Sequence, residues 1–385
     1  VMATEHKKMD EYDAEVSDQT TDTKAVGQDS EVPITAGFDK NSADGFFIRS
    51  KDKQFRLNIG AYTQARYDIN WRDAPAGEDD VENGFYFNRT ILIFNGQFTP
   101  LFDYHFRTNF TEEGADLTIA YLQYNFDNNW LRVGRQFFAL SREDWMWSQD
   151  VLTTEYSAND STFAIGVATG IQAYFQDRKQ RYWLGMSDAS AGVDDDQSEL
   201  TLNGRWEYQA SGSDWSVWDD IIGRKGRSQG VLLGVGGAYQ FEKDQSTFDR
   251  IAQLNADVSF NGDGYQAIVA ASWTRHEPQV GGSYNNYGFL AQSGYFFTNH
   301  SQVYAQYNLI SPGDQPGDLE TFNSITAGIS YFPFIWTNRW KFSMEIAHLF
   351  DALNKTIVES TRSLGWLLSD EDGQTYLRLQ AQFGF

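Results

Sequence analysis

Apolar and polar residues alternate with a period of two from Phe55 to Phe385, and this pattern constrains the fold more than any other feature of the sequence. Successive side chains of a β-strand point to opposite faces, so the period indicates strands with one apolar and one polar face. The runs reach about ten residues, which is longer than most strands of soluble sheets and matches a tilted strand that crosses a bilayer. The chain is therefore predicted to be all-β.

Three stretches show the alternation most clearly, and a helix would scatter their apolar residues around its axis. The apolar sets are Phe55, Leu57, Ile59, Ala61, Ala65, Tyr67 and Ile69; Phe163, Ile165, Val167, Ile171, Ala173 and Phe175; and Val303, Ala305, Tyr307 and Leu309. The last strand repeats the pattern with Leu377, Leu379, Ala381, Phe383 and Phe385. A chain that ends on an apolar strand avoids an exposed sheet edge if this strand pairs with the first one in a closed barrel.

Sixteen strands are predicted, an even number that returns both ends of the barrel to the same side. Their ranges are 54–70, 84–98, 102–111, 116–126, 130–137, 162–176, 180–187, 198–208, 229–241, 249–260, 264–275, 285–296, 301–309, 321–331, 340–350 and 374–385. Short connections, as at 99–101 and 127–129, alternate with longer acidic ones, as at 138–161 and 351–373. This asymmetry is typical of a transmembrane antiparallel β-barrel of the outer membrane, with short turns in the periplasm and long loops outside. The connection 209–229 is too long for its predicted periplasmic side.

Composition excludes several other classes of protein. No run of about 18 apolar residues is present, so no membrane-spanning helix is predicted. The chain has no cysteine, which excludes disulfides and thiolate sites, and its net charge of −23 makes nucleic-acid binding improbable. The five histidines show no metal-ligand spacing, so neither a metal nor a cofactor is predicted. Of the 385 residues, 1–34 are predicted to be a polar periplasmic lead and 35–385 the barrel.

Aromatic residues near predicted strand ends suggest the two interfacial girdles of a membrane barrel. They are Tyr67, Trp71, Trp130, Phe332, Phe334, Trp336 and Trp340.

Several segments together resemble the family of phosphate-selective porins O and P. They include Thr35–Asp39, Gly45–Ser50, Phe87–Gly96 with Arg89, Ala120–Tyr124, and Leu131–Phe137 with Arg132 and Arg135, followed by Ser141-Arg142-Glu143. The resemblance covers roughly residues 35–160, and the terminal Phe385 is similar to the end of other outer-membrane proteins. It implies a sixteen-stranded barrel of a Gram-negative outer membrane, surrounded by lipid and lipopolysaccharide and assembled as a homotrimer.

The resemblance also implies that the third extracellular loop folds inward and narrows the pore. Here that loop is 138–161, and its candidate constriction residues are Arg142, Glu143, Asp144, Trp145 and Asp150. Anion-selective members of the family line their pore with arginines. By the parity of the strands, the candidates here are Arg56, Arg66, Arg107, Arg132, Arg205 and Arg378, and Arg89 and Arg135 match family segments without a settled facing.

The acidic balance departs from the family pattern, because carboxylates share the predicted inner face with the arginines. They are Asp68, Glu207, Asp257 and Glu345. Two readings of the arginines stay open: they pair with carboxylates and make the wall rigid, or they select solutes.

The predicted function is that of a water-filled channel for passive diffusion of small hydrophilic solutes and inorganic ions, with phosphate or other anions among the candidates. No catalytic residue is predicted, since no G-x-S-x-G motif is present. Two rivals stay open. One is a non-conducting structural barrel or adhesin, and the other is a barrel-embedded or soluble all-β hydrolase.

Overall fold

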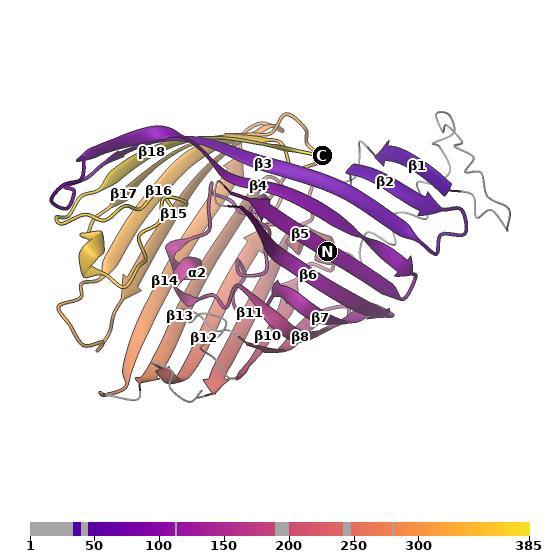
Figure 1. The fold of residues 1–385 in the computed structure, drawn as a ribbon, viewed down its shortest axis with the longest axis horizontal. Coiled ribbons are helices and arrows are strands. Elements are labelled where there is room, and N and C mark those ends of the chain that lie inside the picture. Colours follow the sequence, from indigo (N-terminus) through magenta and orange to yellow (C-terminus); the bar gives the residue numbers. More distant parts are fainter. Residues whose placement is uncertain (1–33, 40–44, 112–113, 189–199, 242–247, 279–280) are drawn as a thin grey trace.

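The computed structural model describes residues 34–39, 45–111, 114–188, 200–241, 248–278 and 281–385. Long antiparallel strands dominate it (Figure 1). The strands are β1 (Ile34–Asp39), β2 (Gly45–Ser50), β3 (Arg56–Trp71), β4 (Val81–Thr99), β5 (Phe102–Phe110), β6 (Ala115–Phe126), β7 (Asn129–Phe137), β8 (Val167–Gln176), β9 (Gln180–Ser187), β10 (Leu200–Ser211), β11 (Gly230–Phe241), β12 (Phe248–Asn261), β13 (Tyr265–Pro278), β14 (Tyr284–Phe296), β15 (Ser301–Ser311), β16 (Phe322–Tyr331), β17 (Lys341–Leu349) and β18 (Thr375–Gly384). The helical elements are short: α2 (Ala158–Phe163), η1 (Trp215–Trp218) and η2 (Leu353–Lys355).

Strands β3 to β18 form a closed ring of sixteen, each antiparallel to its neighbours along the chain. The ring closes between the last strand and the first, where β18 pairs with β3 over residues such as Gln380 and Arg66. Main-chain hydrogen bonds between Phe385 and Ala61, of 2.9 and 3.1 Å, complete this seam. The predicted sixteen-stranded barrel is confirmed, and most strand boundaries agree within three residues.

The hairpin β1–β2 lies outside the ring and was not predicted as strands. Strand β2 pairs with the beginning of β3, from Arg56 to Ile59, and β18 pairs with the rest of the same edge of β3. The hairpin therefore continues the sheet beyond the end of β18, and in Figure 1 it projects away from the barrel. Gly45 begins β2 in the left-handed region (φ 65°), where a β-carbon would meet the carbonyl of Ile59 and the terminal Phe385.

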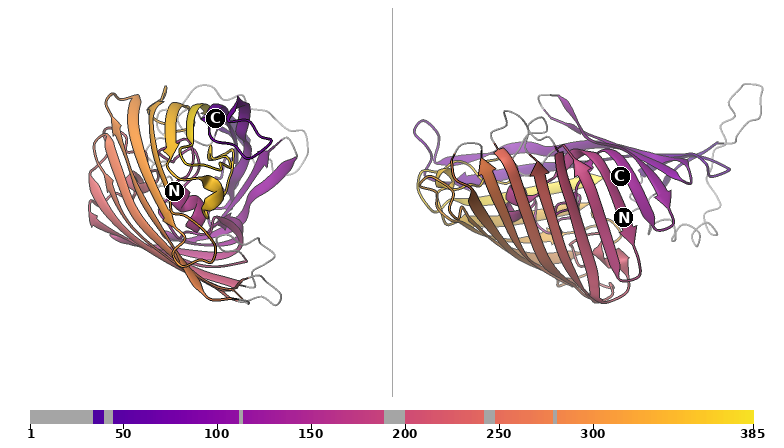
Figure 2. Two further views of the ribbon diagram at one scale, coloured as in Figure 1. Left: turned by 90° about the vertical axis from the view of Figure 1, so that its left-hand side faces the viewer. Right: turned by 90° about the horizontal axis from the view of Figure 1, so that it is seen from below.

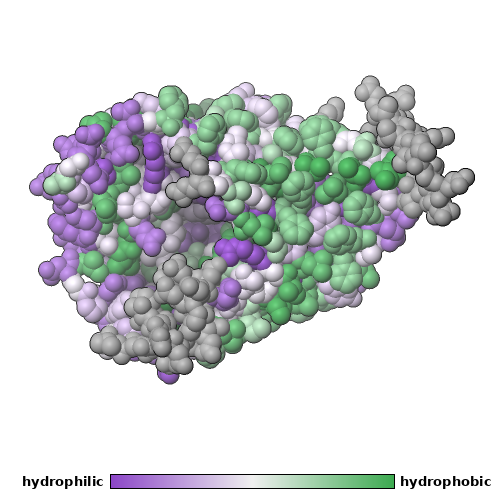
Figure 3. Space-filling model, in the orientation of Figure 1, coloured by the Kyte–Doolittle hydropathy of each residue, from purple (hydrophilic) through white to green (hydrophobic). Residues whose placement is uncertain are grey.

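The two faces of the wall differ as the alternation predicts. On β3, Gln64, Arg66 and Asp68 are buried inside the ring, while Tyr67 and Ile69 between and beside them are partly exposed on its outside. Large apolar side chains cover the outer face of the other strands too, and Phe85 and Leu184 are 85% and 59% exposed. Figure 3 shows this apolar surface over much of the wall, and hydrophilic residues gather at the end of the long loops.

Two predictions about particular residues are wrong. Strand β8 begins at Val167 and not at 162, because the preceding residues form α2 and a turn; Phe163 and Ile165 are buried in the interior and do not lie on the outer face. Trp130 and Phe332 are also buried and belong to no outer girdle, whereas Trp336 is half exposed. An aromatic residue near a turn can point inward and pack against cationic side chains and other aromatic rings.

The connection between β10 and β11, residues 212–229, is the long one on the side of the short turns, and we call it the β10–β11 segment. Its Trp215, Trp218 and Ile222 are buried, and the indole of Trp218 packs with Leu232 of the wall. The insertion predicted at 209–229 is therefore a folded segment. The search of the described residues for a helix that could span a bilayer found none.

Candidate functional site

Residues 138–166 connect β7 to β8 and contact the inner face of the ring on several sides; we call them the β7–β8 segment. The hydroxyl groups of Ser148 and Tyr62 are hydrogen-bonded at 2.5 Å, which joins the segment to β3. Asn159 donates to Ser272 of β13 at 3.1 Å, on another part of the ring. Figure 2 (left) looks along the barrel and shows α2, which belongs to this segment, within the outline of the strands.

Asp144 holds the two ends of the β7–β8 segment together. Its carboxylate accepts hydrogen bonds from the main-chain amides of Leu140 (3.2 Å), Ile165 (3.3 Å) and Gly166 (2.9 Å). Burial raises the pKa of Asp144 to about 7, although these amide donors act in the opposite direction. The two ends of the segment are thus held together by its own residues, and we call this joined part, residues 140–144 with 165–166, the neck.

Glycines of the wall make room for this segment. A β-carbon on Gly236 of β11 would collide with the carbonyl of Leu140, and one on Gly288 of β14 would collide with the side chains of Asn159 and Phe163. Any larger residue at these inward positions would displace the segment. The segment therefore packs this closely against the wall because these two positions carry no side chain.

Glu155 lies at the far end of the segment and is bound by two arginines of the wall. Arg89 of β4 forms a bidentate pair with it, at 2.6 and 2.7 Å, and Arg66 of β3 donates to the same carboxylate at 2.9 Å. Burial alone would raise the pKa of Glu155, but the two guanidinium groups outweigh burial and lower it. The carboxylate is therefore a stable anion in this position.

Residues beside Glu155 are fixed to β17 and β18. Lys341 donates to the carbonyls of Val151 (3.1 Å) and Thr153 (3.2 Å), and Glu345 accepts from the amide and hydroxyl of Thr154 at 3.0 and 2.9 Å. Arg378 of β18 donates to the hydroxyl of Thr154 at 3.2 Å and pairs with Asp68 at 2.9 Å. The tip of the β7–β8 segment is therefore held by charged groups of four neighbouring strands.

A second set of buried ion pairs lies on β9, β10 and β12. Arg205 pairs with Glu207 and Asp257, each at 2.8 Å, and Arg181 pairs with Glu207 at 2.5 Å. Arg205 also donates to the carbonyl of Leu140 at 3.0 Å. These pairs fix the base of the β7–β8 segment to the wall opposite its tip.

The β7–β8 and β10–β11 segments meet inside the ring. The amide of Ile221 donates to the carbonyl of Asp150 at 3.2 Å, and Arg142 donates to the carbonyl of Trp218. Asn338, from the connection between β16 and β17, donates to both Asp150 (3.0 Å) and Asp220 (3.2 Å). One amide group therefore joins three connections.

The two carboxylates of this junction ionise differently. Burial, together with the neighbouring Asp220, raises the pKa of Asp150 to about 7. Burial acts on Asp220 as well, but Arg227, which binds it at 2.6 and 2.7 Å, outweighs burial and lowers the pKa of Asp220 to about 2. The junction is therefore more stable when Asp150 is protonated.

The predicted site residues fall into four groups. Arg66, Arg89, Arg205 and Arg378 are bound by carboxylates. Arg107 and Arg132 lie over aromatic rings, with Arg107 4.4 Å from the ring centre of Trp147 and Arg132 4.0 Å from that of Trp130. Arg142, Glu143, Asp144, Trp145 and Asp150 belong to the β7–β8 segment, where Glu143 accepts from Gln292 of β14 at 3.0 Å and Trp145 packs on Trp183 of β9.

Arg56 and Arg135 form the last group and lie away from these contacts. Arg56 begins β3 and donates to Asn58 at 2.8 Å. Arg135 lies opposite Ala120 and Thr169, and Thr169 is exposed on the outer face. Since paired residues of neighbouring strands point to the same side, Arg135 faces outward.

Sequence reasoning missed Glu155, Lys341, Arg181 and Asp220. The strand parity of Arg181 and Lys341 is readable, because each alternates with apolar residues of its strand. Glu155 and Asp220 stand in irregular connections, where no period shows which way a side chain points.

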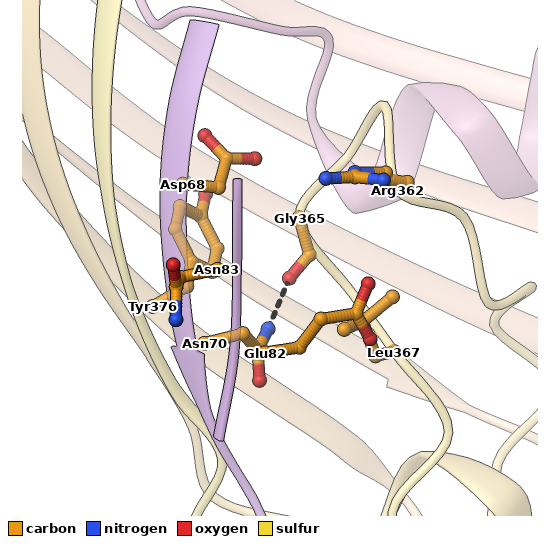
Figure 4. Close-up of a pocket in the computed structure, with 8 residues that line it drawn as sticks. All are labelled: Asp68, Asn70, Glu82, Asn83, Arg362, Gly365, Leu367 and Tyr376. Atoms are coloured by element: carbon orange, nitrogen blue, oxygen red, sulfur yellow. Dashed lines mark hydrogen bonds between the residues drawn. The ribbon is translucent and has the colours of Figure 1, made fainter. Parts of the chain in front are cut away.

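Two cavities lie near the end of the long loops. One, of about 20 Å³, is lined by Asp68, Asn70, Glu82 and Arg362 among others (Figure 4), and its walls are joined by a 2.9 Å hydrogen bond from Asn70 to the carbonyl of Gly365. It has room for about one water molecule. The other, of about 150 Å³, is lined by uncharged residues: Thr162, Thr274, His276, Tyr284, Asn286, Gln315 and Ile357. Within the described part of the chain, no three His, Asp or Glu side chains are grouped to hold a metal ion.

Comparisons with known proteins agree with the resemblance seen in the sequence. The family model of phosphate-selective porins O and P matches residues 59–213, which confirms the resemblance there. The search of curated proteins found no match. Solved structures with a similar fold include the anion-selective porin from Comamonas acidovorans, with 14% identity and a TM-score of 0.61 over 86% of this chain and 99% of that one.

Two structures of OmpT, an outer membrane protein of Vibrio cholerae, are also similar in fold. One has 11% identity and a TM-score of 0.55 over 86% of this chain and 98% of that one. The other, a trimer form folded in vitro, has 9% identity and a TM-score of 0.56 over 85% and 99%. At these identities the likeness is one of fold.

Proposed function

We propose that this chain is an integral outer-membrane porin, a channel for passive diffusion of small hydrophilic solutes and inorganic ions. The observation that carries the proposal is the separation of the two faces of a closed ring. Apolar side chains such as Phe85 and Leu184 lie exposed outside, and charged and amide side chains such as Arg66 and Gln64 lie inside. An apolar surface of this extent is unstable in water and suits a bilayer, and a ring of sixteen strands is wide enough for an aqueous path.

In this proposal the β7–β8 segment is the third extracellular loop, folded into the lumen as the constriction. Its contacts with β3 and β17 on one side of the ring and with β13 on another support this assignment. The β10–β11 segment narrows the same passage from the periplasmic side. Residues 1–34, of which 1–33 lie outside the described part of the chain, are assigned to the periplasm, and residues 35–385 to the barrel and its hairpin.

The arginines are assigned mainly a structural role. Arg205 and Arg378 pair with carboxylates of their own, and Arg66 and Arg89 share the carboxylate of Glu155. All but one of these four charges are therefore cancelled for a passing ion. Arg107 and Arg132 contact rings and take part in none of the ion pairs of the described residues, and they favour anions modestly. We therefore expect a weak anion preference and little retention of phosphate.

The assembly is proposed to be a homotrimer in contact with lipid and lipopolysaccharide, by analogy with the family. A channel is favoured over an enzyme because the charged groups of the interior are engaged in holding two connections to the wall. No observation favours the adhesin over the channel, and conductance separates them.

Planar-bilayer recording of the purified protein tests the proposal. Open steps of porin size are expected, with a reversal potential in a potassium chloride gradient slightly on the anion side. A silent membrane with correctly folded protein, judged by heat-modifiable gel mobility, would favour a non-conducting barrel. Hydrolysis of a chromogenic ester or glycoside would favour the enzyme.

A further inference from the structure

The carboxylate of Glu155 receives hydrogen bonds from five donors. Its Oε2 accepts from Arg66 (2.9 Å), Arg89 (2.6 Å) and Asn88 (3.0 Å), and its Oε1 accepts from Arg89 (2.7 Å) and from the main-chain amide of Tyr156 (3.3 Å). The side chain of Glu155 is only 5% exposed. The carboxylate is therefore buried and enclosed by donors on both of its oxygen atoms.

Most of these donors belong to the wall and are held there by other contacts. Arg66 also donates to Gln380 (2.6 Å) and to the carbonyl of Ser363 (2.6 Å), and Arg89 donates to Gln64 (3.0 Å). The two guanidinium groups therefore have supports besides Glu155. Removing the carboxylate would leave their nitrogen atoms aimed at the position it occupied.

Two guanidinium groups face this one carboxylate, so one positive charge remains uncompensated within the cluster. The adjacent Arg378 is paired with Asp68 and adds little net charge. A planar guanidinium fork binds the paired oxygen atoms of carboxylates and of phosphate in the same geometry. The cluster thus has the donors and the charge of a site for a small oxyanion.

We propose that Arg66, Arg89 and Asn88 form an oxyanion site of the barrel wall, and that Glu155 of the β7–β8 segment is its built-in occupant. In the native channel Glu155 prevents small oxyanions from being retained on β3 and β4. Glu155 then determines the specificity of the channel for small oxyanions, because its own carboxylate fills the oxyanion site. The effect on ion flow rests on the proposed channel function, whereas the binding site itself does not.

The substitution Glu155→Ala removes the occupant and makes room for a free anion. Calorimetric titration of the detergent-solubilised protein with inorganic phosphate, and separately with acetate, measures whether the site is filled. We expect the variant to bind phosphate at least about tenfold more tightly than the native protein, as two charge-assisted forks become available. The double variant Glu155→Ala/Arg89→Gln is expected to lose this gain.

Two matched variants separate charge from space. Glu155→Gln removes the charge but keeps a side chain of the same size in the site, so it is expected to bind phosphate no better than the native protein. Glu359→Ala removes an exposed carboxylate of the 350–374 connection, which contacts neither arginine, and is expected to behave as the native protein.

Bilayer recording gives the second readout. Phosphate added to Glu155→Ala channels is expected to reduce their conductance at concentrations that leave native channels unchanged. Binding with no effect on current would limit the proposal to the site, and silence of the native protein would contradict the channel and leave the titration to decide the site. Equal phosphate binding by Glu155→Ala and native protein, both showing heat-modifiable mobility, would overturn the inference.

Discussion

The carbonyl of Leu140 lies against Gly236 of β11, closer than a β-carbon on that residue would tolerate. Leu140 belongs to the β7–β8 segment and Gly236 to the inner face of the wall, so the fit between them depends on a missing side chain. A β-carbon on the adjacent Gly237, which points outward, would lie 3.3 Å or more from its nearest neighbouring atoms.

The substitution Gly236→Ala is therefore expected to push the base of the β7–β8 segment away from β11, at a cost of about 1–3 kcal/mol, as is usual for overpacking. Single-channel conductance should fall, because the segment moves toward the lumen. Gly237→Ala is the matched control and should keep native conductance. Equal conductance of all three proteins would show that the segment is not seated by this contact.

Arg205→Leu is expected to destabilise the barrel by about 3–5 kcal/mol, because Asp257 would be left as a buried charge without its cation. The measurement is the temperature at which the folded band is lost on a gel. The double variant Arg205→Leu/Asp257→Leu should recover much of the loss. Arg275→Leu breaks an exposed pair with Glu277 and should cost about 1 kcal/mol or less.

The junction between Asp150 and Asp220 is expected to loosen as the pH rises. The pKa of Asp150 is about 7 in the folded protein against an ordinary 3.8, so the fold binds an extra proton between these values. Its stabilising effect is complete below the ordinary pKa and is lost as the pH rises through about 7. Lys341 and Arg339 attract the ionised form, and Asp220 repels it.

Trypsin reports on this junction, because Lys225 in the β10–β11 segment is exposed. Cleavage there is expected to be up to about a hundredfold faster near pH 8 than near pH 5 once corrected for the enzyme's own pH dependence, because about two pKa units of linkage lie between pH 5 and a pKa of about 7. Asp150→Asn should remove the difference. A native protein cut equally at both pH values would contradict the assignment.

Arg142→Met should loosen the β10–β11 segment at every pH, since Arg142 donates to the carbonyl of Trp218 and methionine keeps its length without its donors. Faster tryptic cleavage at Lys225 and a red-shifted tryptophan emission are the expected results. Arg178→Met, at an exposed turn, serves as the control. Unchanged cleavage would mean that apolar contacts such as Met146 with Ile221 suffice.

The strands of the wall were predicted well because each strand has an apolar outer face and a polar inner face, and this difference appears in the sequence as a period of two. The inner arginines were predicted for the same reason, as at Arg66, Arg205 and Arg378. The prediction failed where the backbone leaves the sheet. Phe163 and Ile165 continue the alternation of β8 by coincidence. Phe163 ends α2, and the two residues are buried in two different inner clusters.

Arg135 shows a different limit. Gly134, with a φ of 130°, stands between it and the regular part of β7, and the register with Ala120 and Thr169 of the neighbouring strands reveals its facing. Glu155 shows a third limit, because its role depends on Arg66 and Arg89 from distant positions in the chain. Such partners come together only when the ring closes, and a single sequence does not show which residues then meet.

The neck that Asp144 closes has a consequence for how such a channel can change. Because the segment gathers its own two ends, its tip can be lengthened, shortened or recoded without disturbing the strands that flank it. Engineering can therefore exchange residues 145–164 when a graft keeps Asp144 and its three amide donors and also supplies a carboxylate for Arg66 and Arg89 of the wall.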